Sequence, residues 1–416
     1  MKFEFRTAGE SHGKGLVSLV EGVPAGLEIS AEKHIDPELR RRQGGYGRGG
    51  RMKIEQDRVE FVSGVRLGET FGAPLAMLVW NRDWENWQTA MSAEAPGEDA
   101  SDTDLRRVHL PRPGHADLVG VLKYGREDAR DILERASARE TTARVAAGAV
   151  AKRFLDELGV SVGSHIVRLG DVEAKRPETW PEDLNAASDP SPLRTLDPDA
   201  EARMIEAVDA AQAEGDTLGG VFEVVATGLP AGLGSYVAWD RRLDGRLAGA
   251  LMSIQAMKGV EIGLGFEAAR RRGSGVHDEI EFDPAWNLGR TGGYRRRSNN
   301  AGGLEGGITT GAPLVARVAM KPLSSLMKPL RSVDLRTRER ADAIRERSDV
   351  AALAAAGVVG EAMVAIVLAD AMLEKFGGDS MAETRRNLDG YMADLERRSR
   401  EIRERTDDEH YESGAL

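Results

Sequence analysis

The chain has 416 residues, of which 41% are hydrophobic and 30% charged, so it can bury a large core in one large domain or two ordinary ones. The formal net charge of −11 argues against a nucleic-acid-binding surface spread over the whole molecule, although a local basic cluster is compatible with it. The absence of cysteine excludes disulfides and thiolate metal sites, and it fits a reducing compartment.

The first residues have a strand pattern and no basic, then apolar, leader. No apolar run approaches the roughly 20 residues that a membrane span needs. We therefore expect a cytoplasmic protein without a membrane or nucleic-acid partner, and without a bound metal.

Strand and helix patterns alternate along the chain. Alternating apolar residues closed by glycine turns predict strands at 2–7, 16–26, 59–65 and 219–232. Apolar residues at helical spacing predict helices at 140–159, from Asp197 onward, at 246–259 and at 357–378. The last of these is apolar nearly all round from Met363 to Leu373, which predicts a buried helix.

Two stretches rich in acids, proline and serine, 92–104 and 174–200, are predicted to be surface insertions. After residue 378 the composition becomes strongly charged, with only a thin apolar stripe at helical spacing. We therefore expect one domain over residues 1–378 and a charged helical tail over 379–416, with a frayed end.

One short pattern occurs twice, as GVPAGL at 22–27 and GLPAGL at 228–233, each time closing a predicted strand. The repeat favours two structurally related halves. A common turn chemistry used twice explains it equally well.

Two histidines stand in glycine turns, His12 in GESHG and His115 in RPGHAD. Turns without bulky neighbours let a ligand approach the imidazole, and a histidine pair suits a reaction with two proton events. Taken alone, either histidine is more simply a structural or solvated residue.

A basic, glycine-rich run follows at 40–53, RRRQGGYGRGGRMK. Its glycine amides and its arginines, Arg40, Arg41, Arg42, Arg48 and Arg51, match phosphate or carboxylate geometry and favour a small dianionic ligand. A nucleic-acid patch is the competing interpretation, but Tyr46 is the only aromatic residue in the run, so there is no stacking platform.

Other stretches repeat this theme of glycine backbone with hydroxyl or cationic side chains. They are ERASARET at 134–141, NNAGGLEGGITTG at 299–311, AMKPLSS at 319–325 and RERSDV at 345–350. The first precedes a predicted helix, whose free amides favour an anion. In the last, Asp349 is equally well explained as a helix cap.

Together these motifs resemble those of the chorismate synthase family, in order and nearly in spacing, from about residue 1 to about residue 385. The matching blocks are GESHG, RRRQGGYGRGGRM, RPGHAD, ERASARETTARVAAGAVAK, GDTLGG, SIQAMKGVEIG, AGGLEGGITTG, MKPLSS and RSDV. The resemblance implies an α/β fold in which helices are sandwiched between two antiparallel sheets with internal pseudo-symmetry, assembled as a homotetramer.

The resemblance also implies an activity. Family members eliminate phosphate from 5-enolpyruvylshikimate 3-phosphate in an anti-1,4 reaction that gives chorismate, and they need reduced FMN without net redox change. Two other functions stay open: an NADPH-dependent flavin oxidoreductase and a nucleic-acid-binding protein.

Site residues follow from the resemblance motif by motif. His12, with Ser11 beside it, would protonate the departing phosphate, His115 would hold the charge of the reduced flavin, and Asp349 with Ser11 would move a flavin proton. The implied FMN contacts are Arg135, Ala136, Ser137, Gln255, Ala256, Gly306, Lys321, Pro322, Leu323, Ser324, Ser325 and Arg347. Arg42 and Arg48 match family positions for NADP(H), but they are equally able to hold substrate phosphate. The expected substrate-binding arginines are Arg48, Arg51, Arg112 and Arg139.

Overall fold

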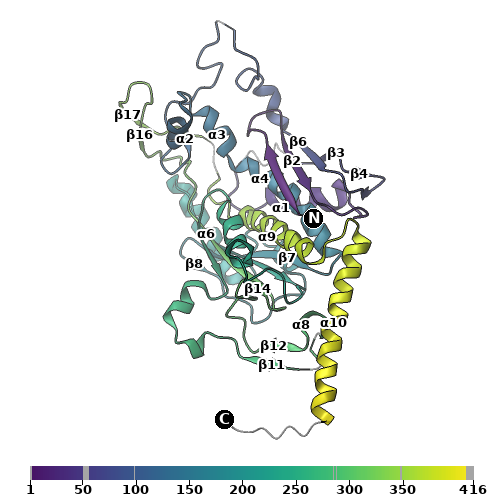
Figure 1. The fold of residues 1–416 in the computed structure, drawn as a ribbon. Helices are drawn as coiled ribbons and strands as arrows, with labels where there is room; N and C mark the ends of the chain where they lie inside the picture. The colour runs from purple at the N-terminus through teal and green to yellow at the C-terminus, as the bar shows by residue number, and fades with distance from the viewer. Residues whose placement is uncertain are drawn as a thin grey trace.

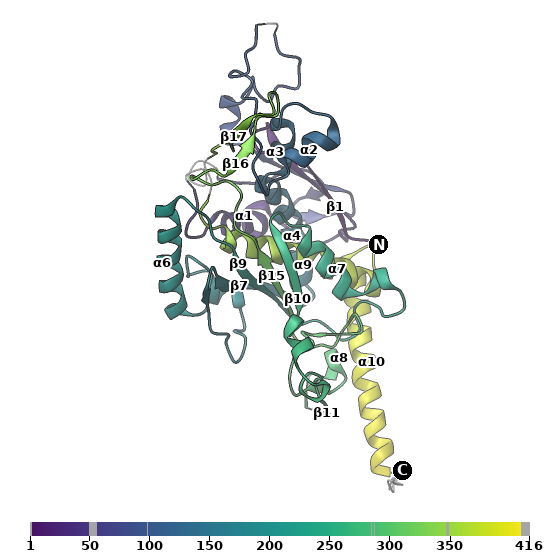
Figure 2. The same cartoon turned by 90° about the vertical axis from the view of Figure 1, so that its left-hand side faces the viewer.

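The computed structural model describes residues 2–49, 56–97, 99–283, 285–286, 288–346 and 349–408. Within them the strands form two larger antiparallel sheets and several two-stranded hairpins (Figures 1 and 2). The four-stranded sheet has the order β1(Glu4–Ala8), β2(Gly15–Glu21), β6(Leu75–Trp80), β3(Glu60–Ser63). The five-stranded sheet has the order β10(Met257–Ile262), β15(Leu314–Met320), β9(Gly220–Thr227), β7(Ser161–Leu169), β8(Val172–Glu173).

Four hairpins and ten α-helices complete the described structure. The hairpins are β4(Val65–Arg66) with β5(Glu69–Thr70), β11(Ile280–Phe282) with β12(Tyr294–Arg296), β13(Leu304–Glu305) with β14(Ile308–Thr309), and β16(Arg331–Val333) with β17(Arg340–Asp342). The helices are α1(Asp36–Gln43), α2(Asp117–Tyr124), α3(Arg130–Ala136), α4(Thr141–Asp156), α5(Leu184–Ser188), α6(Pro198–Glu214), α7(Leu243–Met252), α8(Leu288–Thr291), α9(Leu353–Phe376) and α10(Met381–Asp408). The predicted α/β class with antiparallel sheets is confirmed.

The core is built where helices α4 and α9 meet. Helix α4 packs on β1 and β2, helix α9 packs on β7 and β9, and the two helices pack on each other. Gly148 permits this contact, because a Cβ there would lie 2.2 Å from the Ala362 Cβ. On the central strand β9, Phe222, Val224 and Ala226 are fully buried toward α9, as strand periodicity requires.

Helix α9 corrects one expectation from the sequence. With 24 residues and a mean hydropathy of 1.9 in its most apolar window, it is long and apolar enough to cross a membrane, contrary to the sequence analysis. However, 89% of that window is buried inside the protein, as the all-round apolar pattern predicted. Helix α9 is therefore the central core helix of this fold.

Two further predictions need correction. The helix predicted at 246–259 ends at Met252, and the chain turns before β10 begins at Met257, because this segment pairs with β15. The stretch 174–200 is not a loose surface insertion, since it contains α5 and buries Leu193 and Arg194. By contrast, Asp197 caps α6 through the Asp199 and Ala200 amides, as predicted.

The repeated glycine turns have the same hydrogen bonds. In the first, the Thr70 hydroxyl donates to the Pro24 carbonyl at 2.6 Å and accepts the Leu27 N–H at 3.0 Å. In the second, the corresponding bonds of 2.7 and 2.8 Å join Thr309, Pro230 and Leu233. The two turns are therefore alike in their hydrogen bonds as well as in their sequences.

The charged tail forms α10, which passes beside α8 and packs on it, with the Ser399 hydroxyl donating to the Gly292 carbonyl at 2.7 Å (Figures 1 and 2). Its beginning is anchored, because Met381 and Leu388 are buried and the Tyr391 hydroxyl donates to the Ala231 carbonyl at 2.9 Å. The predicted domain boundary at 378 stays a prediction.

Candidate active site

One cavity of about 280 Å³ gathers most of the residues that the sequence analysis singled out. Its lining includes the predicted residues Ser11, His12, Arg42, Arg48, Arg112, His115, Ser137, Arg139, Gln255, Ala256, Leu323, Ser324, Ser325 and Asp349. We call this space the cleft cavity. Residues more than 300 positions apart in the chain therefore meet in one place.

His12 lies in the turn between β1 and β2. Gly9 makes this turn possible, because it has a φ of +101° and a Cβ there would lie 2.3 Å from the Gly15 carbonyl oxygen. The buried Glu134 accepts the His12 amide at 2.8 Å and lies 2.9 Å from its ring Nδ1. Burial alone would raise the pKa of Glu134, but the hydrogen bonds from His12 outweigh it and the pKa is lowered.

Ser11 is buried beside His12, and its amide donates to the Glu134 carbonyl at 2.9 Å. The Ser137 hydroxyl donates to the Ser11 hydroxyl at 3.1 Å. The GESHG turn is thus tied to the ERASARET segment by both backbone and side chains.

His115 follows the turn at Gly114, whose φ is +77°. Its Nδ1 lies 2.5 Å from Asp117 Oδ1, and Arg112 donates to the other oxygen of that carboxylate through Nε at 2.9 Å. Burial would raise the pKa of Asp117, but the bonds from His115 and Arg112 hold that pKa well below its usual range. An ionised Asp117 therefore orients both the imidazole and the guanidinium.

Two buried arginines form another wall. Arg139 contacts Asp57 Oδ1 at 2.7 Å, and Arg42 donates to Thr141 Oγ1 at 2.9 Å while its Nη1 lies 3.7 Å from Asp57. Burial lowers the pKa of Arg42, and Asp57 offsets part of that effect. Asp57 does not line the cavity, so its charge supports the two cations from behind.

Arg48 and Asp349 come together although they lie in motifs 300 positions apart. Arg48 Nε is 3.1 Å from Asp349 Oδ2, and the Gly49 amide donates to Asp349 Oδ1 at 2.6 Å. Asp349 precedes α9 but does not cap it, since no side chain caps that helix. The helix-cap explanation for this aspartate is therefore wrong.

Several predicted residues lie outside the cleft cavity. Arg135 donates instead to the Gly9 and Thr7 carbonyls and lines a neighbouring cavity of about 500 Å³, which shares Gln255 with the cleft cavity. Lys321 donates to the Gly114 carbonyl, and Gly306 lies in the turn of the β13–β14 hairpin, with Tyr236 nearby. Ala136 and Pro322 are also absent from the described lining. Arg51 and Arg347 lie outside the described residues.

The sequence analysis missed the residues that hold the predicted ones in place. Glu134, Asp117 and Asp57 are the carboxylates behind His12, His115 and the arginines, and Trp87 stacks on the His12 ring. Asp117 and Glu134 do belong to quoted motifs. Asp117 ends RPGHAD, two residues after His115, and Glu134 begins ERASARET, three residues before Ser137. No signal in the sequence indicated Trp87 or Asp57, because their contacts exist only after folding.

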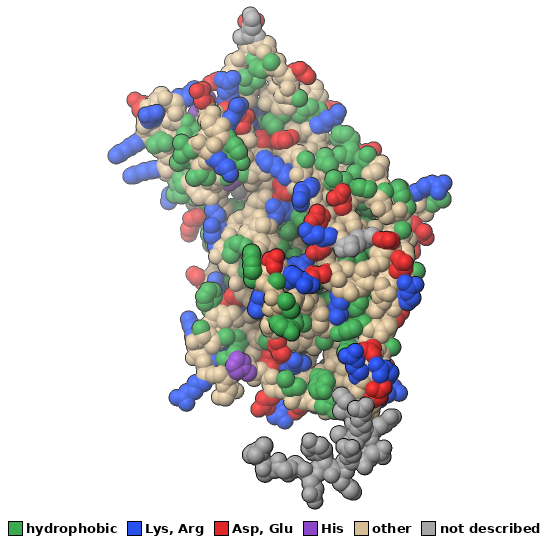
Figure 3. All heavy atoms as spheres, viewed as in Figure 1, with side chains coloured by type: hydrophobic (Ala, Val, Ile, Leu, Met, Phe, Trp, Pro, Cys, Tyr) green, Lys and Arg blue, Asp and Glu red, His purple; other side chains and the backbone are tan. Residues whose placement is uncertain are grey.

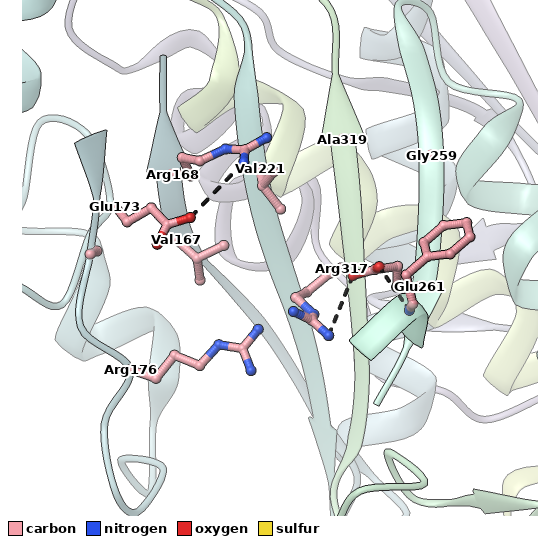
Figure 4. A pocket seen from close by; sticks show the side chains of 11 residues that line it. Val167, Arg168, Glu173, Arg176, Val221, Gly259, Glu261, Arg317 and Ala319 are labelled. Atoms are coloured by element: carbon pink, nitrogen blue, oxygen red, sulfur yellow. Dashed lines mark hydrogen bonds and ion pairs between the residues drawn. The ribbon is translucent and has the colours of Figure 1, made fainter. Parts of the chain in front are cut away.

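A third cavity, of about 350 Å³, lies on the outer face of the five-stranded sheet (Figure 4). Arginines and glutamates line it side by side, as the pairs of Arg168 with Glu173 at 4.0 Å and Arg317 with Glu261 at 3.3 Å show. We call it the sheet cavity. None of the sequence-predicted site residues lines it.

Over the described residues, no group of three or more His, Asp or Glu side chains is arranged to hold a metal ion. On the face shown in Figure 3, Lys and Arg side chains are interspersed with Asp and Glu rather than collected in one basic patch. Four arginines, Arg42, Arg48, Arg112 and Arg139, are gathered instead in the lining of the cleft cavity.

Comparison with known proteins agrees with this geometry. Residues 3–373 match the family model for chorismate synthase. The chain is 58% identical over 389 residues to the chorismate synthase of Geobacter metallireducens, covering 93% of this chain and 98% of that one. It is 55% identical over 396 residues to the chorismate synthase of Aquifex aeolicus, covering 93% and 97%. A solved structure, described as the crystal structure of chorismate synthase, has a TM-score of 0.76 and 44% identity and covers 95% of this chain and 99% of its own. The chain belongs to the chorismate synthase family.

Proposed function

We propose that the cleft cavity binds 5-enolpyruvylshikimate 3-phosphate together with reduced FMN, and that its side chains carry out the anti-1,4 elimination of phosphate. The family activity makes the chain a carbon–oxygen lyase of aromatic amino acid biosynthesis. The single observation that carries the proposal is the meeting of His12, His115 and four arginines in one cavity.

The arginines suit a substrate that has two carboxylates and a phosphate. Arg112 and Arg139 are almost fully buried, so their charges act through a medium of low dielectric constant and attract anions strongly. Each is also fixed by a carboxylate, Asp117 or Asp57, which keeps its guanidinium in one orientation. Arg48 adds a third cation from the glycine-rich run.

The two histidines divide the proton chemistry. Glu134 engages Nδ1 of His12, so we assign protonation of the departing phosphate to Nε2. Asp117 engages Nδ1 of His115 in the same way and orients that ring to hold charge beside the flavin. Asp349 and Ser11 line the same cavity and would help to move a proton when the flavin is bound.

The residues present fit FMN. Gln255 Oε1 is buried and accepts no hydrogen bond within the described chain, so it is able to accept one from a flavin N–H. The cavity has apolar walls for a flat ring system, supplied by Ile254, Met257, Met320, Leu323 and Val359. Ser137, Ser324 and Ser325 offer hydroxyls for the ribityl phosphate arm. When bound, the reduced flavin supplies electron density transiently and recovers it.

NADP(H) binding at Arg42 and Arg48 is a second, separate part of the proposal. Arg42 Nη1 is buried and makes no hydrogen bond within the described chain, which leaves it able to meet a phosphate. The same atom serves the phosphate of the substrate equally well.

The finer fold expectation is that helices are sandwiched between pseudo-symmetric sheets. It is supported by equivalent strand orders, β1-β2-β6-β3 in one sheet and β7-β9-β15-β10 in the other, and by the matching glycine turns. Assembly as a homotetramer in the cytoplasm rests on the family resemblance. Exposed aromatic residues such as Trp239 and Tyr236 are consistent with such contacts.

The test is anaerobic phosphate release from 5-enolpyruvylshikimate 3-phosphate. We expect release that requires reduced FMN in catalytic amount, with chorismate as the product. Stoichiometric consumption of NADPH per product would instead show a flavin oxidoreductase. No release with any reductant would overturn the proposal.

A further inference from the structure

His12 is held on one face by a residue that belongs to none of the family motifs quoted above. Its imidazole stacks on the Trp87 indole, with ring centroids 3.8 Å apart and planes inclined by 24°. Trp87 is 9% exposed, and it lies in the segment between β6 and α2, just before the stretch predicted to be a surface insertion. This segment therefore reaches the active site.

Two cations also contact the indole, and Arg106, which is as close to the ring centroid as the imidazole is, must lie on the other face. The guanidinium carbon of Arg106 lies 3.9 Å from the Trp87 ring centroid, and that of Arg130 lies 5.2 Å away. The indole N–H donates to Asp83 at 2.9 Å, so the ring is fixed within its own plane as well. Trp87 is thus clamped between His12 and Arg106.

Arg106 is itself fixed by three contacts. Its guanidinium donates to the Asn86 carbonyl at 2.9 Å, its own carbonyl accepts from Arg130 Nε at 2.9 Å, and its amide donates to Thr103 at 3.1 Å. Arg130 in turn contacts Glu134, the carboxylate on the other side of His12. The clamp and the Glu134 contact therefore form one connected network around the imidazole.

The backbone of Arg106 gives independent support. Its φ is +49°, in the left-handed region that side chains other than glycine rarely adopt. Such strain is kept where the surrounding structure and function require the side chain. Here the side chain is the one stacked on Trp87.

We propose that Trp87, clamped by Arg106, is a positioning residue that holds the His12 ring in the plane from which it donates its proton. The inference rests on the proposed function, because it gives His12 the role of proton donor. Glu134 contacts the imidazole at Nδ1, in the plane of the ring. The stacked indole limits tilting of the ring out of that plane and shields one of its faces from water.

The test compares Trp87→Leu and Trp87→Phe in the phosphate-release assay. We expect Trp87→Leu to lower kcat by about 30-fold with KM for the substrate changed less than twofold, because a misplaced catalytic group costs up to about 10²-fold. Trp87→Phe keeps an aromatic face and should recover most of this loss. Trp286→Leu is the matched control, since Trp286 is 48% exposed and does not line the cleft cavity.

A second variant keeps the test decisive if Trp87→Leu folds poorly. Arg106→Gly removes the guanidinium, and glycine adopts a positive φ without strain, so the fold should be retained. We expect kcat to fall about fivefold, with unchanged affinity for FMN measured by fluorescence titration. A rise in KM together with a fall in FMN affinity, with kcat unchanged, would show a merely structural segment.

Two failures are distinguishable. If the wild-type protein releases no phosphate, the proposed function fails. If the wild type is active and His12→Ala is inactive, but Trp87→Leu and Arg106→Gly keep wild-type kcat, only the inference about Trp87 is overturned.

Discussion

The cleft cavity and the sheet cavity are similar in size and both contain arginines paired with carboxylates, yet these arginines differ in exposure to water. In the cleft cavity the side chains of Arg112 and Arg139 are 7% and 3% exposed, whereas Arg168 and Arg176 of the sheet cavity are 46% and 43% exposed. Water screens the second pair and hardly reaches the first. Burial, rather than the number of arginines, therefore distinguishes the proposed anion site from the sheet cavity.

The polar groups between the cations differ as well. The cleft cavity is lined by two histidines and by five hydroxyl groups, those of Ser11, Ser137, Thr141, Ser324 and Ser325. The described lining of the sheet cavity has neither type. Only the first therefore presents imidazole and hydroxyl groups to a ligand.

The largest expected effect is the loss of a histidine from the cleft cavity. We expect His12→Ala and His115→Ala to lower kcat by about 10²- to 10⁴-fold, the range for removing a general acid or base. His277→Ala, at an exposed histidine, should leave the rate unchanged. The measurement is anaerobic phosphate release, and near-wild-type rates for both variants would remove the distinction between the two cavities.

The next effect concerns the carboxylates behind the histidines. Glu134→Gln and Asp117→Asn keep the side-chain shape but remove the charge that orients each ring, so we expect kcat to fall by about 10²-fold. Asp131→Asn is the matched control, because Asp131 pairs with Arg126 on the surface. Equal rates for Asp117→Asn and the control would show that Arg112 alone positions His115.

These two carboxylates also make stability depend on pH. Hydrogen bonds lower the pKa of both Glu134 and Asp117 below that of the unfolded chain, which titrates near about pH 4. Their contribution is therefore complete above about pH 5, begins to fall near about pH 4, and is lost progressively as pH approaches the lower pKa values of the folded protein. Thermal unfolding between pH 7 and pH 3 should show a steeper fall in Tm for the wild type than for Asp117→Asn, and identical slopes would contradict this assignment.

The residues of the candidate site were easier to predict from the sequence than the partner residues that hold them in position. Glycines around His12 and His115 and the basic run at 40–53 carry local signals, because turns and charge clusters are encoded by neighbouring letters. Trp87 and Asp57 carried none, since an indole or a buried carboxylate acquires its role only from partners far away in the chain. The same limit explains the overextended helix at 246–259, where pairing of β10 with β15 overrides helical spacing.

The smallest effect on activity is expected for Arg176→Ala in the sheet cavity, and this variant gives the sharpest contrast with the cleft cavity. Arg176, labelled in Figure 4, contacts the fully buried Glu223 at 3.2 Å. In the variant, Glu223 would still have His165 at 3.2 Å and Arg317 at 3.9 Å as neighbours. Without Arg176 the buried Glu223 carboxylate loses one of its cationic partners, which should lower the free energy of unfolding by about 1–2 kcal/mol. The rate of phosphate release should stay within twofold of wild type, since the sheet cavity shares no lining residue with the cleft cavity. Urea unfolding and the phosphate-release assay measure the two effects separately. A tenfold loss of activity with unchanged stability would mean that the exposed cations of the sheet, and not only the buried ones of the cleft, act on the substrate.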